Sequence, residues 1–312
     1  MRFLVVGAGG IGCYYGARLQ AAGHEVVFVA RGEHLRVMQQ QGLQVEHAEL
    51  HFARPVVAVS ESDVLARYSV GEFDLILLCF KAFDTLDWLV RMTDWLETAA
   101  TPVLSLQNGV DNEPLIAAQI GTARTLGGLA VRIGGHITAP GCVAADGPAQ
   151  IIMGPWPQAD SIDSDGYRWL QQLNRVFIDA GIPARVTPDI ALELWRKLLI
   201  NNGVNPLSAL TGLTTRELVQ DPYFGQSVRQ MMLETAAVAQ VDGVSLNNDD
   251  IDEMIALLNS FDAIKTSMLV DHEKGKPLEL DAICGAVIRR ADQAGIDTPV
   301  NRLVYALLNQ SG

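Results

Sequence analysis

The sequence has few cysteines, little basic charge and no long hydrophobic run, and each absence argues against a class of protein. Its four cysteines show no C-x-x-C spacing, so we expect reduced thiols and no metal site. The net charge of −13 argues against a nucleic-acid partner, which needs a basic face. No apolar run approaches membrane-spanning length, and no room remains for a signal peptide before the first apolar segment. We therefore expect a cytoplasmic protein with neither a nucleic-acid nor a membrane partner.

The sequence is rich in residues that form a core. Its 312 residues are 49% hydrophobic and 19% charged, which is typical of a globular chain with two domains. In the first part, apolar runs such as 74–80 and 102–106 alternate with helical segments, as in buried parallel strands. We expect residues 125–133 and 142–153 to add later strands to the same sheet.

Beyond Pro188 the pattern is helical throughout. Helices are predicted over residues 189–209, 222–242, 249–265 and 278–294. The fold class is therefore α/β, with an N-terminal doubly wound Rossmann domain followed by an all-helical C-terminal domain. We place the dinucleotide-binding domain over residues 1–188 and the helical substrate domain over residues 189–312.

A glycine-rich turn directly after the apolar run 3–6 is the most informative motif. It fits the G-x-G-x-x-G pattern of a dinucleotide-binding turn between a strand and a helix. Gly7 would permit the tight turn, Gly9 would let the backbone approach a pyrophosphate, and Gly12 would let the helix pack on the strand. The alternative is a glycine-rich turn without a ligand. The residues of the motif are Gly7, Ala8, Gly9, Gly10, Ile11 and Gly12.

The end of the second predicted strand indicates which dinucleotide is bound. Enzymes that prefer NAD place Asp or Glu there, against the ribose 2′-hydroxyl. This chain has Arg31 and no acid in that stretch, and a guanidinium could pair with a 2′-phosphate that a carboxylate would repel. The sequence therefore predicts NADP(H), and the alternative is a solvated charge at the strand end.

Two more polar loops follow apolar strands directly. Lys81 comes after residues 75–80, and Gln107-Asn108-Gly109 comes after residues 103–106. Ligands of such sheets bind beyond the carboxyl ends of the strands, so we expect Lys81 and Asn108 in the site, where the two domains meet. An ordinary surface lysine and an ordinary turn are the alternative.

The first helix of the second domain carries a polar stripe. Lys197, Asn201 and Asn205 are four residues apart, so their side chains are offset by about 40° each and span about 12 Å of one helix face. An ammonium and two amides among apolar neighbours need partners, which a polar substrate could supply. The alternative is a solvated stripe. The Asn205-Pro206 pair is expected to bend or end the helix.

Two candidates lie further along the chain. Pro277 suits the first turn of a helix, and Glu279 would then lie near the helix N-terminus, where its charge is favourable. That is a sufficient structural role, and the functional one makes Glu279 an acid/base or ordering partner of Lys197. Ser267 is a candidate hydroxyl donor.

Together and in order, these motifs resemble those of the ketopantoate reductase (2-dehydropantoate 2-reductase) family over nearly the whole chain. The resemblance implies NADPH-dependent reduction of ketopantoate to (R)-pantoate in pantothenate and coenzyme A biosynthesis. The matching segments are Gly7–Gly12, Arg31, Cys79–Ala82, Gln107–Val110, Lys197, Asn201, Asn205-Pro206, Thr266–Leu269, Glu279 and Arg289–Ala291.

The resemblance also implies a role for each candidate residue. Lys197 would be the proton donor, and Glu279 would orient it and hold the new hydroxyl. The implied substrate contacts are Asn108, Lys197, Asn201, Asn205 and Ser267. The implied cofactor contacts are Gly7 to Gly12, Arg31, Lys81, Asn108 and Glu279.

Two other functions stay open at the level of sequence. One is a related NAD(P)H-dependent reductase of another 2-keto or 3-keto acid. The other is a non-catalytic NADP(H)-binding regulatory protein, although such a protein has no need of both Lys197 and Glu279. Helical second domains of such enzymes often pair, so a homodimer is an option that no sequence feature decides.

Overall fold

The structure, a computed structural model, describes residues 1–260 and 263–310, and it divides into two compact units. The first unit comprises Met1–Gln107 and Asn112–Ile190, and the second comprises Asn108–Asp111 and the chain from Ala191 onward. The short segment Asn108–Asp111 therefore packs with the second unit, although its neighbours in sequence on both sides belong to the first. The sequence did not predict this.

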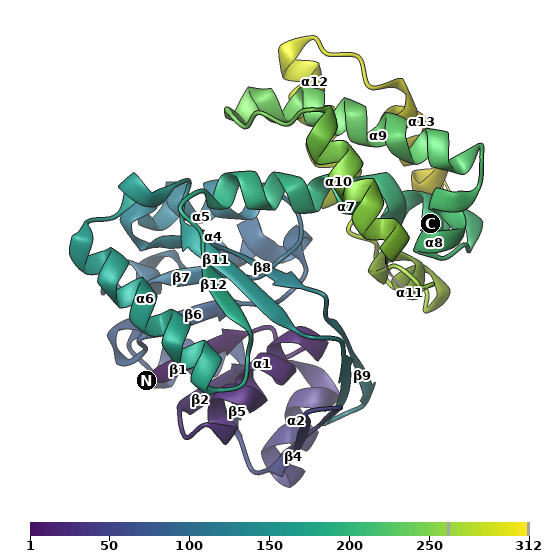
Figure 1. The fold of residues 1–312 in the computed structure, drawn as a ribbon. Coiled ribbons are helices and arrows are strands. Elements are labelled where there is room, and N and C mark those ends of the chain that lie inside the picture. The colour runs from purple at the N-terminus through teal and green to yellow at the C-terminus, as the bar shows by residue number, and fades with distance from the viewer. Residues whose placement is uncertain (261–262, 311–312) are drawn as a thin grey trace. The chain divides into compact units, whose positions relative to one another are not determined.

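An eight-stranded sheet is the centre of the first unit (Figure 1). The strand order is β12-β11-β8-β7-β6-β1-β2-β5, and neighbours are parallel except for the antiparallel pair β8 and β11. The predicted fold class, a Rossmann-type α/β domain followed by a helical one, is confirmed. The strands are β1 (Arg2–Val6), β2 (Glu25–Val29), β5 (Val57–Val59), β6 (Leu75–Leu78), β7 (Val103–Ser105), β8 (Thr125–Val131), β11 (Gln150–Pro155) and β12 (Ala184–Val186).

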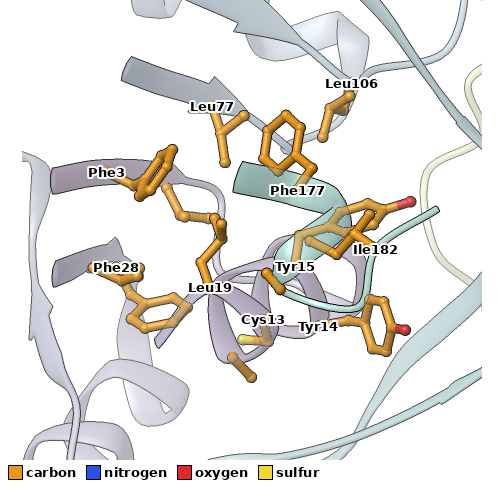
Figure 2. Close-up of a cluster of buried hydrophobic side chains, with 14 of the residues drawn as sticks. Phe3, Cys13, Tyr14, Tyr15, Leu19, Phe28, Leu77, Leu106, Phe177 and Ile182 are labelled. Carbon is orange, nitrogen blue, oxygen red and sulfur yellow. The ribbon is translucent and has the colours of Figure 1, made fainter. Parts of the chain in front are cut away.

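Helices cover both faces of this sheet because its central strands are apolar on both sides. In β1, Phe3 and Val5 belong to one buried cluster, whereas Leu4 and Val6 belong to another. Side chains of α1 and α6 fill the first cluster, in part shown in Figure 2, and those of α3, α4 and α5 fill the second. The helices are α1 (Gly10–Ala21), α2 (Gly32–Gln41), α3 (Glu61–Arg67), α4 (Thr85–Leu96), α5 (Asn112–Ile120) and α6 (Ser164–Asp179).

A second, four-stranded sheet corrects one prediction. It has the order β4-β3-β10-β9, so residues 142–146 leave the main sheet, and from the predicted strand 142–153 only the part in β11 joins it. Gly147 and Ala149 both have positive φ between these parts and turn the chain from one sheet to the other. The strands are β3 (Leu43–His47), β4 (Leu50–Arg54), β9 (Gly134–Ala139) and β10 (Cys142–Asp146).

The second unit is helical over its described residues. Three of its helices, α8, α11 and α13, were not predicted, and α7 continues through Pro206 rather than ending there. The predicted helix over 249–265 ends at Ser260, and its residues 261–262 lie outside the described chain. The helices are α7 (Ile190–Thr211), α8 (Thr215–Gln220), α9 (Phe224–Ala239), α10 (Asn248–Ser260), α11 (Ser267–Glu273), α12 (Ala286–Ala294) and α13 (Pro299–Gln310).

The start of the last-but-one helix also differs from the prediction. Pro277 lies outside any helix, and a π-helical turn over Asp281–Gly285 leads into α12. The backbone carbonyl of Glu279 accepts a hydrogen bond from the N–H of Ile283 at 3.1 Å, so Glu279 stands at the entrance of this turn. It does lie at a helix N-terminus, but Pro277 does not open that helix.

Three findings bear on the expected protein class. Across residues 1–260 and 263–310, no helix is both long and apolar enough to cross a membrane. In the same residues, no three His, Cys, Asp or Glu side chains gather in a way that could hold a metal ion. All four cysteines are free, and burial raises the pKa of the Cys13 and Cys284 thiols, so both are protonated at neutral pH.

Candidate active site

The turn after β1 has a conformation that depends on its glycines. Gly7 has φ of +95°, and a Cβ there would lie 2.6 Å from the backbone nitrogen of Phe80. A Cβ on Gly12 would lie 2.3 Å from the carbonyl oxygen of Gly7, so a side chain would force α1 away from the turn. At Gly9, by contrast, an added Cβ has no atom of the described chain within 4 Å apart from Gly9 and its two chain neighbours. The turn is thus closed by protein at Gly7 and Gly12 and open at Gly9.

Gly10 is closed off by the second sheet. A Cβ on Gly10 would lie 2.1 Å from the carbonyl carbon of Gly135 and 2.4 Å from the backbone nitrogen of His136, both in β9. Strand β9 therefore packs directly on the first turn of α1. His34 of α2 joins the same region, because the N–H of Gly141, in the β9–β10 turn, donates to its Nδ1 at 3.0 Å. The close contact of two backbones explains why position 10 is glycine.

The N-terminus of α1 is suited to an anion. Its N-cap residue, Gly9, supplies no side-chain hydrogen bond, and the first turn contains no acidic residue. The first N–H groups of a helix have no intrahelical partner, and the helix dipole places partial positive charge there. These features fit the pyrophosphate of a dinucleotide.

Arg31 ends the strand segment next to this turn. It is the N-cap residue of α2, its side chain is 92% exposed, and its Nη1 lies 4.0 Å from a carboxylate oxygen of Asp84. An exposed pair at this distance contributes little to stability. The guanidinium is therefore available for a ligand at low structural cost.

The loop after β6 contacts the glycine turn, and the loop after β7 is hydrogen-bonded to the loop after β6. Lys81 is half-buried and precedes the short 3₁₀ turn Ala82–Asp84, next to Phe80, which contacts Gly7. Gln107 is buried, and its Nε2 donates to the Phe80 carbonyl at 3.1 Å and to the Thr85 hydroxyl at 2.8 Å. Lys81 thus lies at the same sheet edge as the glycine turn, whereas the Gln107 side chain holds the two loops together.

In the second unit, the polar stripe lies on α7 as predicted. Lys197 and Asn201 are half-buried and Asn205 is buried. Asn202, one position away, has a different role, because its Nδ2 donates to Thr235 and to Asn301 inside the helical core. Several apolar neighbours on α7 are buried, namely Leu194, Leu198, Leu199 and Val204.

The structure joins two candidate residues, Asn108 and Glu279, that no sequence pattern connects. The amide Nδ2 of Asn108 donates to a carboxylate oxygen of Glu279 at 3.1 Å, and Glu279 is only 7% exposed. A buried carboxylate requires hydrogen-bond donors, and Asn108 supplies one of them. These residues are 171 positions apart, so no local pattern could have predicted the pair.

Ser267 is exposed at the first position of α11. Its neighbour Thr266 is buried and caps the helix, because the Thr266 hydroxyl accepts a hydrogen bond from the N–H of Leu269 at 3.2 Å. The capping role therefore belongs to Thr266, and Ser267 is the exposed residue next to it.

Comparison with known families covers most of the chain. Residues 3–158 match the model described as "Ketopantoate reductase PanE/ApbA". Residues 189–311 match the model described as "Ketopantoate reductase PanE/ApbA C terminal". The second match begins where the sequence changes to helical periods alone.

Individual proteins match from end to end. The chain is 32% identical to a 2-dehydropantoate 2-reductase of Mesorhizobium japonicum, over 99% of the chain and 97% of that protein. The crystal structure of 2-dehydropantoate 2-reductase from Methylococcus capsulatus is 31% identical and has a TM-score of 0.85, covering 99% of this chain and 96% of that one. A D-mandelate dehydrogenase solved with NADH and anilino(oxo)acetate shares the fold, at 24% identity and a TM-score of 0.87, covering 99% and 98%.

Proposed function

This chain belongs to the ketopantoate reductase family, and we propose that it reduces 2-dehydropantoate to pantoate with NADPH, a step of pantothenate biosynthesis. The observation that carries the proposal is the stripe of one lysine and two asparagines on helix α7, flanked by buried apolar side chains. Such a stripe offers a proton donor next to two amides that can bind a hydroxyl or a carboxylate.

The first unit supplies the features that a dinucleotide needs. The backbone at Gly9 and the N-terminus of α1 would hold the pyrophosphate, and Arg31 would pair with the 2′-phosphate of NADP(H). Lys81 would contact the ribose region from the same sheet edge. When bound, the reduced nicotinamide supplies the hydride that converts the ketone to an alcohol.

The second unit supplies the proton. Reduction of the ketone would place negative charge on the carbonyl oxygen of the substrate. The ammonium of Lys197 would stabilise that charge and donate a proton to the oxygen, which completes the alcohol. Asn201 and Asn205 would bind the terminal hydroxyl of the substrate, and Ser267 its carboxylate. Glu279, with Asn108 bound to it, would orient the lysine and accept a hydrogen bond from the new hydroxyl.

The reaction with ketopantoate is tested directly. We expect purified protein to oxidise NADPH only when ketopantoate is added, with kcat/KM above about 10⁴ M⁻¹s⁻¹ as for ordinary enzymes. A panel of other 2-keto and 3-keto acids is run in parallel, because the fold is shared with a D-mandelate dehydrogenase and so does not decide the substrate. Turnover of another acid but not ketopantoate would replace the proposed substrate. NADPH binding without any turnover would instead favour a regulatory protein.

Arg31→Ala tests the choice of cofactor. We expect this change to raise the Kd for NADPH about 10- to 100-fold, because charge-assisted hydrogen bonds to the 2′-phosphate are lost. The Kd for NADH, which lacks that phosphate, should stay nearly unchanged. Fluorescence titration of both cofactors measures this. Arg36→Ala is the matched control, because Arg36 lies on the same helix and forms an exposed ion pair with Glu33. Equal increases in the Kd for NADPH and for NADH would show that Arg31 does not bind the 2′-phosphate.

A further inference from the structure

Asp111 connects the segment Asn108–Asp111 to α12. One carboxylate oxygen of Asp111 accepts a hydrogen bond from Arg290 Nη1 at 2.6 Å, and the other accepts one from Arg289 Nη2 at 2.7 Å. All of these residues belong to the second unit. Two consecutive arginines thus share one aspartate, which defines what we call the Asp111 clamp (Asp111, Arg289 and Arg290).

Arg290 is held more firmly than a surface arginine. Its side chain is 11% exposed, its Nε donates to Asp242 at 2.8 Å, and its guanidinium carbon lies 5.4 Å from the ring centre of Trp195. Trp195 is buried on α7, two positions before Lys197. A guanidinium fixed by a carboxylate and an aromatic face has little freedom, so it can hold Asp111 in one place.

Arg289 extends the clamp to the π-helical turn. Its Nη2 also donates to the backbone carbonyl of Asp281 at 3.1 Å. Gly109 packs against the same turn: it has φ of +96°, and a Cβ there would lie 2.8 Å from the carbonyl oxygen of Ala282. The turn begins just after Glu279, and π-helical turns are frequent at functional sites.

We propose that Asp111, held by Arg289 and Arg290, is a positioning residue that keeps the Asn108 amide on the carboxylate of Glu279. The segment from Asn108 to Asp111 is only four residues long, so fixing Asp111 at one end and Gly109 in the middle limits where Asn108 can lie. The ion pairs lie at one end of the segment and the Asn108–Glu279 hydrogen bond at the other. Asp111 acts through Asn108 and contacts no reacting group itself. This inference rests on the proposed function, because it gives Asn108 and Glu279 their roles in the site.

A double-mutant cycle between Asp111→Asn and Asn108→Ala tests the inference. The expected cost of D111N in kcat/KM is about 10- to 100-fold, as for a misplaced positioning group. In the N108A background D111N is expected to cost less than about 3-fold, because the group that it positions is gone. The same cycle is run on the Kd of NADPH, which needs no substrate, because Asn108 and Glu279 are also implied cofactor contacts. The same loss of the D111N effect in the N108A background is expected there. Equal costs of D111N in both backgrounds, or no cost in either, would overturn the inference.

Two further variants keep the test decisive. Arg289→Gln removes one arginine of the clamp at a half-exposed position, so it tests the inference even if D111N folds poorly. Its cost in kcat/KM should be smaller than that of D111N and should also vanish in the N108A background. Asp292→Asn is the matched control, because Asp292 lies on α12 in an exposed ion pair with Arg302 and should cost nothing. If wild-type protein shows no turnover of ketopantoate, the proposed function fails, and the NADPH cycle still decides the role of Asp111.

Discussion

Replacing Lys197 by alanine is expected to lower kcat/KM for ketopantoate about 1,000-fold, within the range for loss of general acid catalysis. The reason is that the alkoxide then lacks both a proton donor and a neighbouring positive charge. The Kd for NADPH should stay within about twofold of the wild-type value, because Lys197 is not one of the implied cofactor contacts, most of which lie in the first unit. Steady-state kinetics and fluorescence titration measure the two quantities.

The substitution should leave the fold intact. Lys197 is half-buried within the 22-residue helix α7, and alanine is the strongest helix former. Lys265→Ala is the control, since this lysine of the same unit is exposed and paired with Glu273. Lys197→Arg separates charge from proton transfer, because arginine keeps the charge but does not release a proton at neutral pH. A K197A protein with near-wild-type turnover would show that another group supplies the proton.

The fold could be predicted from sequence where burial is simple. Strands β1 and β6 are buried on both faces, so they appear as continuous apolar runs, and the helical periods after Pro188 indicate the helical unit. The four-stranded sheet could not be predicted. Strand β9 is mostly exposed and has no strong local signal. Strand β10 is part of the predicted strand 142–153, but its pairing with β3, about a hundred residues earlier, has none.

In the candidate site, too, some features could be predicted from sequence and others could not. The stripe Lys197, Asn201 and Asn205 follows from helical period alone, since all three lie on one helix. The bond between Asn108 and Glu279 depends instead on the clamp at Asp111 and on the close contact of Gly109 with the π-helical turn. The sequence predicts each of these two residues as a candidate, but no local pattern pairs them. Long-range pairs of this kind emerge only from tertiary packing.

The two central glycines of the glycine turn have different surroundings, so substitutions at them should have different effects. Apart from its chain neighbours, a Cβ added at Gly9 meets no atom of the described chain within 4 Å, whereas one added at Gly10 would lie 2.1 Å from the backbone of β9. Both glycines would be called cofactor contacts from the motif alone. The structure therefore predicts that one methyl group has opposite consequences at these neighbouring positions.

Gly9→Ala is expected to raise the Kd for NADPH about 10- to 100-fold without changing stability, because the added methyl group meets only the space in which a pyrophosphate would lie. Its φ of −84° suits alanine, so no backbone strain is added. Gly10→Ala should instead lower Tm by about 3 to 10 °C, since the methyl group must displace β9. Thermal unfolding without cofactor and NADPH titration separate the two effects. If G9A destabilised the apoprotein as much as G10A does, the open position at Gly9 would not be a ligand site.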